Sequence, residues 1–235
     1  MSKSFSFSQT AYLANHSRLD KADDGCCFSL ALAWLYATSE YKMDVDYFEK
    51  RKVQNRVSRW QKHHSHQLIK KLSRDYEQLH FDVHNKIILD GTTDAGRHNT
   101  KIKNDLIINQ VKKWGGKRNF TLSGAKTSFP AGEKDIYSTL ALYRELTDNG
   151  PIPVYAVILL NGNGKAHALS CSITNEREMI KFFDSNEGEF TFQRKEEFQQ
   201  FFTRYLSTHY PFLDSSWCVI KLNKTMVKRG WSCFR

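Results

Sequence analysis

The spacing of the apolar residues changes partway along the chain, and this change constrains the fold most. Between residues 27 and 148 apolar positions recur mainly at steps of three and four, which is typical of amphipathic helices. After Asn149-Gly150-Pro151 the apolar residues fall into short β-rich runs separated by turn residues. These runs are 153–160, 166–174, 178–184, 189–192 and 215–224. Helices followed by an antiparallel sheet predict an α+β domain.

The helical half contains four candidate helices. They cover 27–41, 45–80 (one long helix or two in series), 104–114 and 133–148, and a further helix at 194–209 interrupts the strands. Residues 85–101 are expected to form a loop around a short strand. Residues 1–24 are rich in serine and are expected to be irregular. With no repeat or Pro-rich linker, 1–235 is predicted to be one domain whose section 45–150 is variable and largely helical.

Composition excludes several classes of protein. The 235 residues are 40% hydrophobic and 13% aromatic, as in globular domains rather than disordered chains. No segment approaches the roughly 18 apolar residues of a membrane span, and the N-terminus lacks the apolar core of a secretory signal. The five cysteines are odd in number, two are adjacent, and none forms a CxxC pair. We therefore expect free thiols in a reducing compartment, and no metal or cofactor.

The net charge of +10 is concentrated in one segment. Nine Lys or Arg and no Asp or Glu lie between Lys50 and Arg74. Such a segment is often only a solvated helix face, but the absence of acids favours a binding role. An anionic membrane surface is one candidate partner, and an acidic substrate surface is another. Nucleic acid is disfavoured, because no recognisable nucleic-acid module accompanies the charge.

Three residues far apart along the chain form a candidate catalytic set. Cys27 opens an apolar helix, where unpaired amides and the helix dipole favour a thiolate. His167 follows 140 residues later at the edge of the predicted sheet, and Asp184 ends the next strand. Adjacent antiparallel strands can bring His167 and Asp184 together. A thiolate, a base and a carboxylate that orients the base are the parts of a cysteine nucleophile site.

Three blocks of sequence carry a specific resemblance. GCCFSLALAW resembles the G-x-C-x-x-L-x-x-x-W segment of the YopT-type cysteine proteases, peptidase family C58. KAHALSC resembles the histidine strand of that family, and FFDSNEGEF is similar to its Asp-x-Asn-x-Gly-Glu-Phe block. The resemblance implies a papain-like fold and identifies Cys27, rather than Cys26, as the nucleophile. It also implies that His167 is the base and Asp184 the residue that orients it.

The same resemblance implies a function. It predicts a bacterial effector or toxin that acts inside a host cell and cleaves a host signalling protein, such as a lipidated Rho GTPase or a protein kinase. Papain-like enzymes usually carry an Asn or Gln oxyanion donor shortly before the cysteine. Here Lys21 and Ala22 occupy those positions, so Gln9 and Asn15 are the candidate donors.

Two other functions stay open at this stage. The same three residues could perform acyl transfer, transglutamination or glutamine deamidation, because all of these reactions share a thioester intermediate. A protein without catalysis could instead use the basic segment 50–74 to bind membranes or nucleic acid.

Overall fold

The computed structural model describes nine stretches of the chain, and the account below is confined to them. They are 1–15, 26–40, 46–74, 93–129, 136–147, 153–162, 165–174, 179–211 and 216–225, with side chains not described at 66–74 and 136–137. Residues 85–92 of the loop expected at 85–101, together with Lys21 and Ala22, lie outside the described residues.

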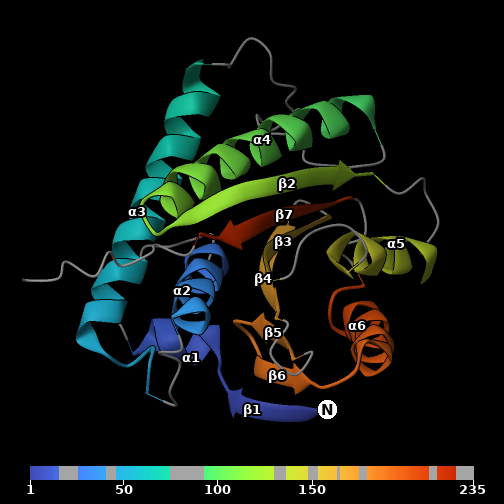
Figure 1. The fold of residues 1–235 in the computed structure, drawn as a ribbon. Coiled ribbons are helices and arrows are strands. Elements are labelled where there is room, and N and C mark those ends of the chain that lie inside the picture. The colour runs from blue at the N-terminus through green and yellow to red at the C-terminus, as the bar shows by residue number, and fades with distance from the viewer. Residues whose placement is uncertain are drawn as a thin grey trace, which may run out of the picture.

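A seven-stranded antiparallel sheet forms the centre of the molecule (Figure 1). Its strands lie in the order β1-β6-β5-β4-β3-β7-β2. Their bounds are β1 Ser2–Ser6, β2 Phe120–Ser128, β3 Val154–Gly162, β4 Lys165–Ile173, β5 Ile180–Asp184, β6 Gly188–Phe192 and β7 Ser216–Lys224. The five strands predicted from the sequence are all present, and β1 and β2 are added at the two edges.

Helices cover both faces of this sheet (Figure 1). Their bounds are α1 Gln9–Ala14, α2 Cys27–Ser39, α3 Arg51–Arg74, α4 Asp94–Gly116, α5 Ile136–Thr147 and α6 Lys195–His209. One face packs against α2, with α1, α3 and α4 around it, and the other face packs against α5 and α6. None of the helices among the described residues is long and apolar enough to cross a membrane.

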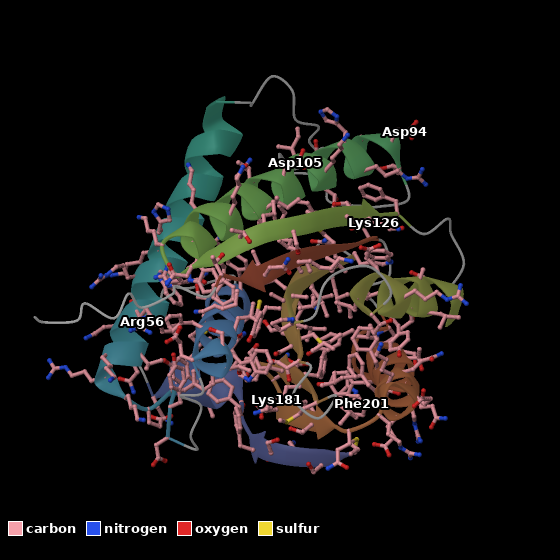
Figure 2. All side chains as sticks on the ribbon, viewed as in Figure 1. Arg56, Asp94, Asp105, Lys126, Lys181 and Phe201 are labelled. Carbon is pink, nitrogen blue, oxygen red and sulfur yellow. The ribbon has the colours of Figure 1, made fainter. Side chains whose placement is uncertain are left out.

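The central strand β3 shows why the sheet needs two helical layers. All nine of its residues are buried, and its first seven, VYAVILL, form a continuous apolar run rather than an alternating one. Because side chains alternate across a strand, Val157 faces the α2 side and Ile158 faces the α5–α6 side. Figure 2 shows the same division further along the sheet, with Lys181 on the side of α2 and Phe201 on that of α6.

The expectation that residues 1–24 are irregular was wrong for residues 2–14. The sequence SKSFSF alternates serine with lysine or phenylalanine, and residues 2–6 form β1, which pairs with β6. Phe7 packs on Phe48 with ring centroids 4.7 Å apart, and α1 follows with Ser8 as its N-cap. The pattern has the period of a strand, although its serines suggested a loop.

The middle section also differs from the prediction in two places. Helix α4 begins at Asp94, ten residues before the predicted start, so 94–101 are helical rather than a loop. Its first turns bury Asn99 and Thr100, and polar residues on the inner face gave no apolar periodicity. The other difference is β2, which contains few apolar residues and pairs with β7 along the edge of the sheet.

A glycine is required at position 188, where β6 pairs with the end of β1. Its φ of +115° lies in a region that residues with a side chain rarely adopt. A Cβ at this position would lie 2.1 Å from the carbonyl oxygen of Phe5 and 2.9 Å from the amide nitrogen of Phe7. The glycine of the FFDSNEGEF block therefore allows the backbone of β1 to pair closely with β6 at the edge of the sheet.

Candidate active site

Cys27 is the first residue of α2, and the spacing of the GCCFSLALAW block defines which face of that helix meets the sheet. Leu30 and Trp34 follow Cys27 at three and seven positions, so all three side chains lie on one face. Leu30 and Trp34 are fully buried, whereas Cys27 is only partly buried. The Ser170 hydroxyl donates to the Ala31 carbonyl at 3.1 Å and fixes α2 against β4.

The register between β4 and β5 brings His167 and Asp184 together. Asp184 pairs with Leu169, and His167 lies two residues before Leu169, so the two side chains are diagonal neighbours on one face. His167 Nε2 lies 2.9 Å from Asp184 Oδ1. Strand β5 ends at Asp184, and just beyond this point the Ala168 N–H of β4 donates to the Cys27 sulfur.

Cys27 has the environment of a stabilised thiolate. Burial alone would raise the pKa of its thiol. The hydrogen bond and positive charge of His167 act in the opposite direction, as do the N–H groups of Ala168 and Phe28. Together they hold the pKa of the Cys27 thiol below its ordinary value. Since Nε2 of His167 faces Asp184, Nδ1 is the ring nitrogen left for the sulfur.

His167 is held in its protonated form by both neighbours. Its side chain is only 7% exposed, and burial would lower the pKa of the imidazole. Hydrogen bonds and charge from Asp184 and Cys27 outweigh this effect and raise the pKa of His167 to about 10. These opposite shifts favour a thiolate beside an imidazolium as the resting pair.

Asp184 is fully buried and surrounded by hydrogen-bond donors. Oδ1 accepts from the Asn186 amide at 2.8 Å as well as from His167, and Oδ2 accepts from the hydroxyls of Tyr205 and Tyr210 at 2.7 and 2.5 Å. Burial would raise the pKa of this carboxyl, but the donors, led by His167, hold the pKa below its usual value. A carboxylate at the edge of the core is thus stable because nearly every lone pair has a partner.

The tyrosines at Asp184 are functional candidates that the sequence did not reveal. Tyr205 lies on α6 and Tyr210 follows its last residue, and the amphipathic pattern of 194–209 predicted only a packed helix. No motif marks Tyr205 or Tyr210, because their roles depend on the approach of α6 to the β5–β6 turn.

The first and third sequence blocks are joined by a hydrogen bond. Trp34 Nε1 on α2 donates to Glu189 Oε2 on β6 at 2.8 Å, and Lys181 Nζ pairs with Glu189 Oε1 at 3.0 Å. Glu189 is only 2% exposed, and the Trp34 ring stacks on Phe183 with centroids 5.6 Å apart. The helix that carries Cys27 is therefore tied to the strands that carry Asp184.

Three other cysteines have a different environment from Cys27. Cys26, Cys171 and Cys218 are free and buried. Burial raises the pKa of the Cys26 thiol to about 12 and that of Cys218 to about 11, and it raises that of Cys171 further. Among the described residues no group of three or more His, Cys, Asp or Glu side chains could hold a metal ion.

The two candidate oxyanion donors lie in different surroundings. Gln9 is beside the site: its backbone N–H donates to the Ser185 carbonyl at 2.7 Å, and its side-chain Oε1 accepts from the Ser185 hydroxyl at 3.2 Å. Asn15 is the exposed C-cap of α1. The backbone N–H groups in the first turn of α2 have no partner within the helix, and that of Phe28 donates to the Cys27 sulfur.

Comparison with known proteins identifies the family. The model of peptidase family C58, described as Yersinia/Haemophilus virulence surface antigen, matches residues 2–211. The chain belongs to this family. The resemblance seen in the three sequence blocks is therefore confirmed, and the C58 match extends across both helical layers and most of the sheet.

One curated protein and one solved structure are similar to this C58 chain. A segment covering 24% of the chain is 41% identical over 61 residues to the cysteine protease YopT of Yersinia enterocolitica and spans 19% of that protein. The crystal structure of the Pseudomonas avirulence protein AvrPphB matches with a TM-score of 0.56 and 17% identity, over 84% of this chain and 91% of that one. The structural match confirms the α+β, papain-like fold.

Proposed function

We propose that this chain is a cysteine peptidase in which Cys27 is the nucleophile, His167 the general base and acid, and Asp184 the residue that orients the imidazole. One observation supports this most strongly. The partly exposed Cys27 thiol at the start of α2 is hydrogen-bonded to His167, which is hydrogen-bonded in turn to the buried carboxylate of Asp184. Membership of a peptidase family supports the same reaction.

The mechanism follows from this geometry. The Cys27 thiolate attacks the carbonyl carbon of a peptide bond, and the N–H groups at the start of α2 stabilise the negative oxygen of the intermediate. Protonated His167 gives its proton to the leaving amine, which leaves an acyl thioester on Cys27. His167 then takes a proton from water, and the resulting hydroxide hydrolyses the thioester. Asp184 accepts from Nε2 throughout, so Nδ1 always faces the sulfur.

The decisive test compares the wild type with Cys27→Ala in a host-cell lysate and maps protein N-termini. We expect new termini with the wild type only, and Cys26→Ala as the matched control should retain them. Losing the nucleophile typically reduces the rate on the order of 10⁴-fold or more. Equal sets of termini with the wild type and Cys27→Ala would rule out Cys27 as the nucleophile.

The same samples distinguish the other reactions of a thioester. A mass change of about one dalton without a new terminus would indicate glutamine deamidation, and an added group would indicate acyl transfer or transglutamination. We propose hydrolysis because the family is one of peptidases.

The substrate is proposed to be a protein of a host cell, with this chain delivered there as a bacterial effector. The names of the relatives support this setting, since one is the cysteine protease YopT and the other an avirulence protein. A host signalling protein is the corresponding substrate class. The lysate experiment identifies that substrate directly, because the cleaved protein is the one that gains the terminus.

Helix α3 is proposed to contact an anionic membrane surface. Residues 51–74 contain no acid, and the side chains of Arg51, Lys52, Arg59 and Lys62 are exposed. Val53 and Val57 on the opposite face are buried against the core, so the cations point outward. Arg56 lies between these faces, with its guanidinium 5.1 Å from the ring centroid of Tyr36 (Figure 2).

Vesicle binding tests the role of α3. Each basic residue near an anionic membrane contributes about 1 kcal/mol, so changing the four exposed cations to Gln should weaken binding on the order of 10² to 10³-fold. The wild type should bind phosphatidylserine vesicles at low salt and leave them at 0.5 M salt. Equal binding to neutral vesicles, or preference for an oligonucleotide competitor, would contradict the proposal.

We also propose that residues 1–235 form one domain. The sheet supports this, because β1 near the start of the chain pairs with β6, and β2 from the middle section pairs with β7. Within the described part of the chain, neither edge strand has another partner in the sheet.

A further inference from the structure

Tyr210, the residue that follows α6, contacts both members of the His167–Asp184 pair. Its ring is stacked on the imidazole of His167, with centroids 4.7 Å apart and an angle of 19° between the planes. Its hydroxyl donates to Asp184 Oδ2 at 2.5 Å and lies 3.0 Å from His167 Nε2. The side-chain amide of Asn186 donates to the same hydroxyl oxygen at 3.1 Å.

The direction of each hydrogen bond follows from the chemistry of the groups. An ionised Asp184 can only accept, so both the Tyr210 hydroxyl and the His167 Nε2–H must donate to it. The lone pairs of the Tyr210 oxygen are then left to face Nε2–H and the Asn186 amide. Nε2–H thus has two acceptors, Asp184 Oδ1 at 2.9 Å and the Tyr210 oxygen at 3.0 Å. A hydroxyl that already donates to a carboxylate is polarised and accepts more strongly.

We propose that Tyr210 is a positioning residue for the reaction, acting on His167 as a second acceptor for Nε2–H and as a cover over one face of the ring. This role rests on the proposed function, because it matters only if His167 serves Cys27. The stacked ring keeps water from the His167–Asp184 hydrogen bond, and electrostatic stabilisation of an imidazolium is greater where water is excluded. The second acceptor fixes the tautomer that leaves Nδ1 towards the sulfur.

Tyr205 provides a matched comparison within the same site. It donates to the same oxygen, Asp184 Oδ2, at 2.7 Å, but its ring stacks on His209 rather than on His167. The substitution Tyr205→Phe therefore removes a similar hydrogen bond from the carboxylate and leaves the contacts of His167 in place.

Three titratable side chains among the described residues contact His167. The titratable groups that contact it are Cys27 from α2, Asp184 from β5 and Tyr210 after α6. Tyr205 on α6 reaches it through Asp184. A change in the balance between the thiolate and the thiol of Cys27 can thus be assigned to one of these groups.

The test is the pH dependence of Cys27 alkylation by iodoacetamide, measured on the full chain with the label located by mass spectrometry. This readout needs no substrate and follows the thiolate directly. Loss of one acceptor weakens the imidazolium and hence the thiolate, so the acid limb of the profile should move to higher pH in Tyr210→Phe. We expect this limb to move by about 1 on the pH scale, so that the alkylation rate at a fixed pH on the limb falls about tenfold. Tyr205→Phe should change that rate by less than about threefold, and Tyr210→Leu, which also removes the cover, should change it more than Tyr210→Phe.

Each other outcome has a distinct meaning. A Tyr210→Phe profile that coincides with the wild type overturns the role of Tyr210 and leaves the proposed function standing. Equal shifts in Tyr210→Phe and Tyr205→Phe also overturn it, because the effect then passes through Asp184 alone. A wild-type Cys27 that reacts like an ordinary thiol refutes the proposed function instead.

A second variant covers the case in which changes at Tyr210 prevent folding. Asn186→Ala removes the amide that holds the Tyr210 hydroxyl and keeps the backbone hydrogen bond to Asp184. It should shift the acid limb in the same direction by a smaller amount, and an unshifted limb overturns the proposal.

Discussion

The substitution Gly188→Ala should detach the first strand from the sheet. The φ of +115° alone costs an alanine about 1–3 kcal/mol. In addition, the new Cβ would lie 2.1 Å from the Phe5 carbonyl oxygen, which belongs to backbone and cannot rotate away. Strand β1 must therefore move, and each of its ladder hydrogen bonds with β6 is worth about 1 kcal/mol net. We expect a total loss of about 3–5 kcal/mol in the free energy of unfolding.

Urea unfolding followed by tryptophan fluorescence measures this loss, and a second glycine supplies the control. A Cβ added at Gly116, in the last turn of α4, has no atom within 4 Å. Gly116→Ala should therefore raise the free energy of unfolding by about 0.5–1 kcal/mol, as alanine does in a helix. If the free energy of unfolding of Gly188→Ala lies within about 1 kcal/mol of that of the wild type, the close approach of the β1 backbone to Gly188 is incorrect.

Three further predictions concern the site. Trp34→Phe removes the donor to the buried Glu189 carboxylate and should lower the free energy of unfolding by about 1–3 kcal/mol in the same titration; no loss would contradict the link between the two blocks. Limiting iodoacetamide at pH 7 should label Cys27 before the buried thiols, because the pKa of Cys27 is lowered whereas burial raises the pKa values of the others. Mass spectrometry of the labelled peptides measures the order, and a buried thiol that is labelled first would refute this prediction. The pKa of Cys27 is lowered and that of His167 is raised to about 10, so peptide cleavage should persist through neutral pH and fall only near pH 10, where His167 loses its proton. A loss of cleavage centred near pH 7 would be inconsistent with the ion pair.

The sequence predicted those parts of the fold in which a physical period is visible. Helix α2 begins at Cys27 as expected, and the five strands from β3 to β7 lie where their apolar runs are. These elements are buried, so burial imposes a regular pattern on their residues. The candidate site depends on the same elements: the start of α2, one end of β4 and the end of β5.

The elements that were missed have weak or misleading patterns. Strand β1 alternates serine with lysine or phenylalanine, and β2 is a polar edge strand that needs to bury little. The first turns of α4 are polar and yet bury Asn99 and Thr100. In each case a partner distant in the chain determines the structure, and a local pattern carries no information about that partner.

The tyrosines of the site were missed for a related reason. Tyr205 and Tyr210 occupy positions where an aromatic residue is ordinary, at the end of an amphipathic helix. Their hydroxyls have a role in the site only because the fold brings both of them within hydrogen-bonding distance of Asp184 Oδ2. Only the three-dimensional arrangement gives them a role beyond packing.

The pairing of the first strand with the sixth has a consequence for how the molecule assembles. Ser2 lies opposite Thr191, so this contact closes a loop of about four fifths of the chain, and such distant contacts slow folding. A nascent chain that has released Cys27 but not yet Asp184 carries the thiol without the carboxylate that orients its base. The set of Cys27, His167 and Asp184 is therefore complete only after Asp184 has been synthesised and β5 has paired with β4.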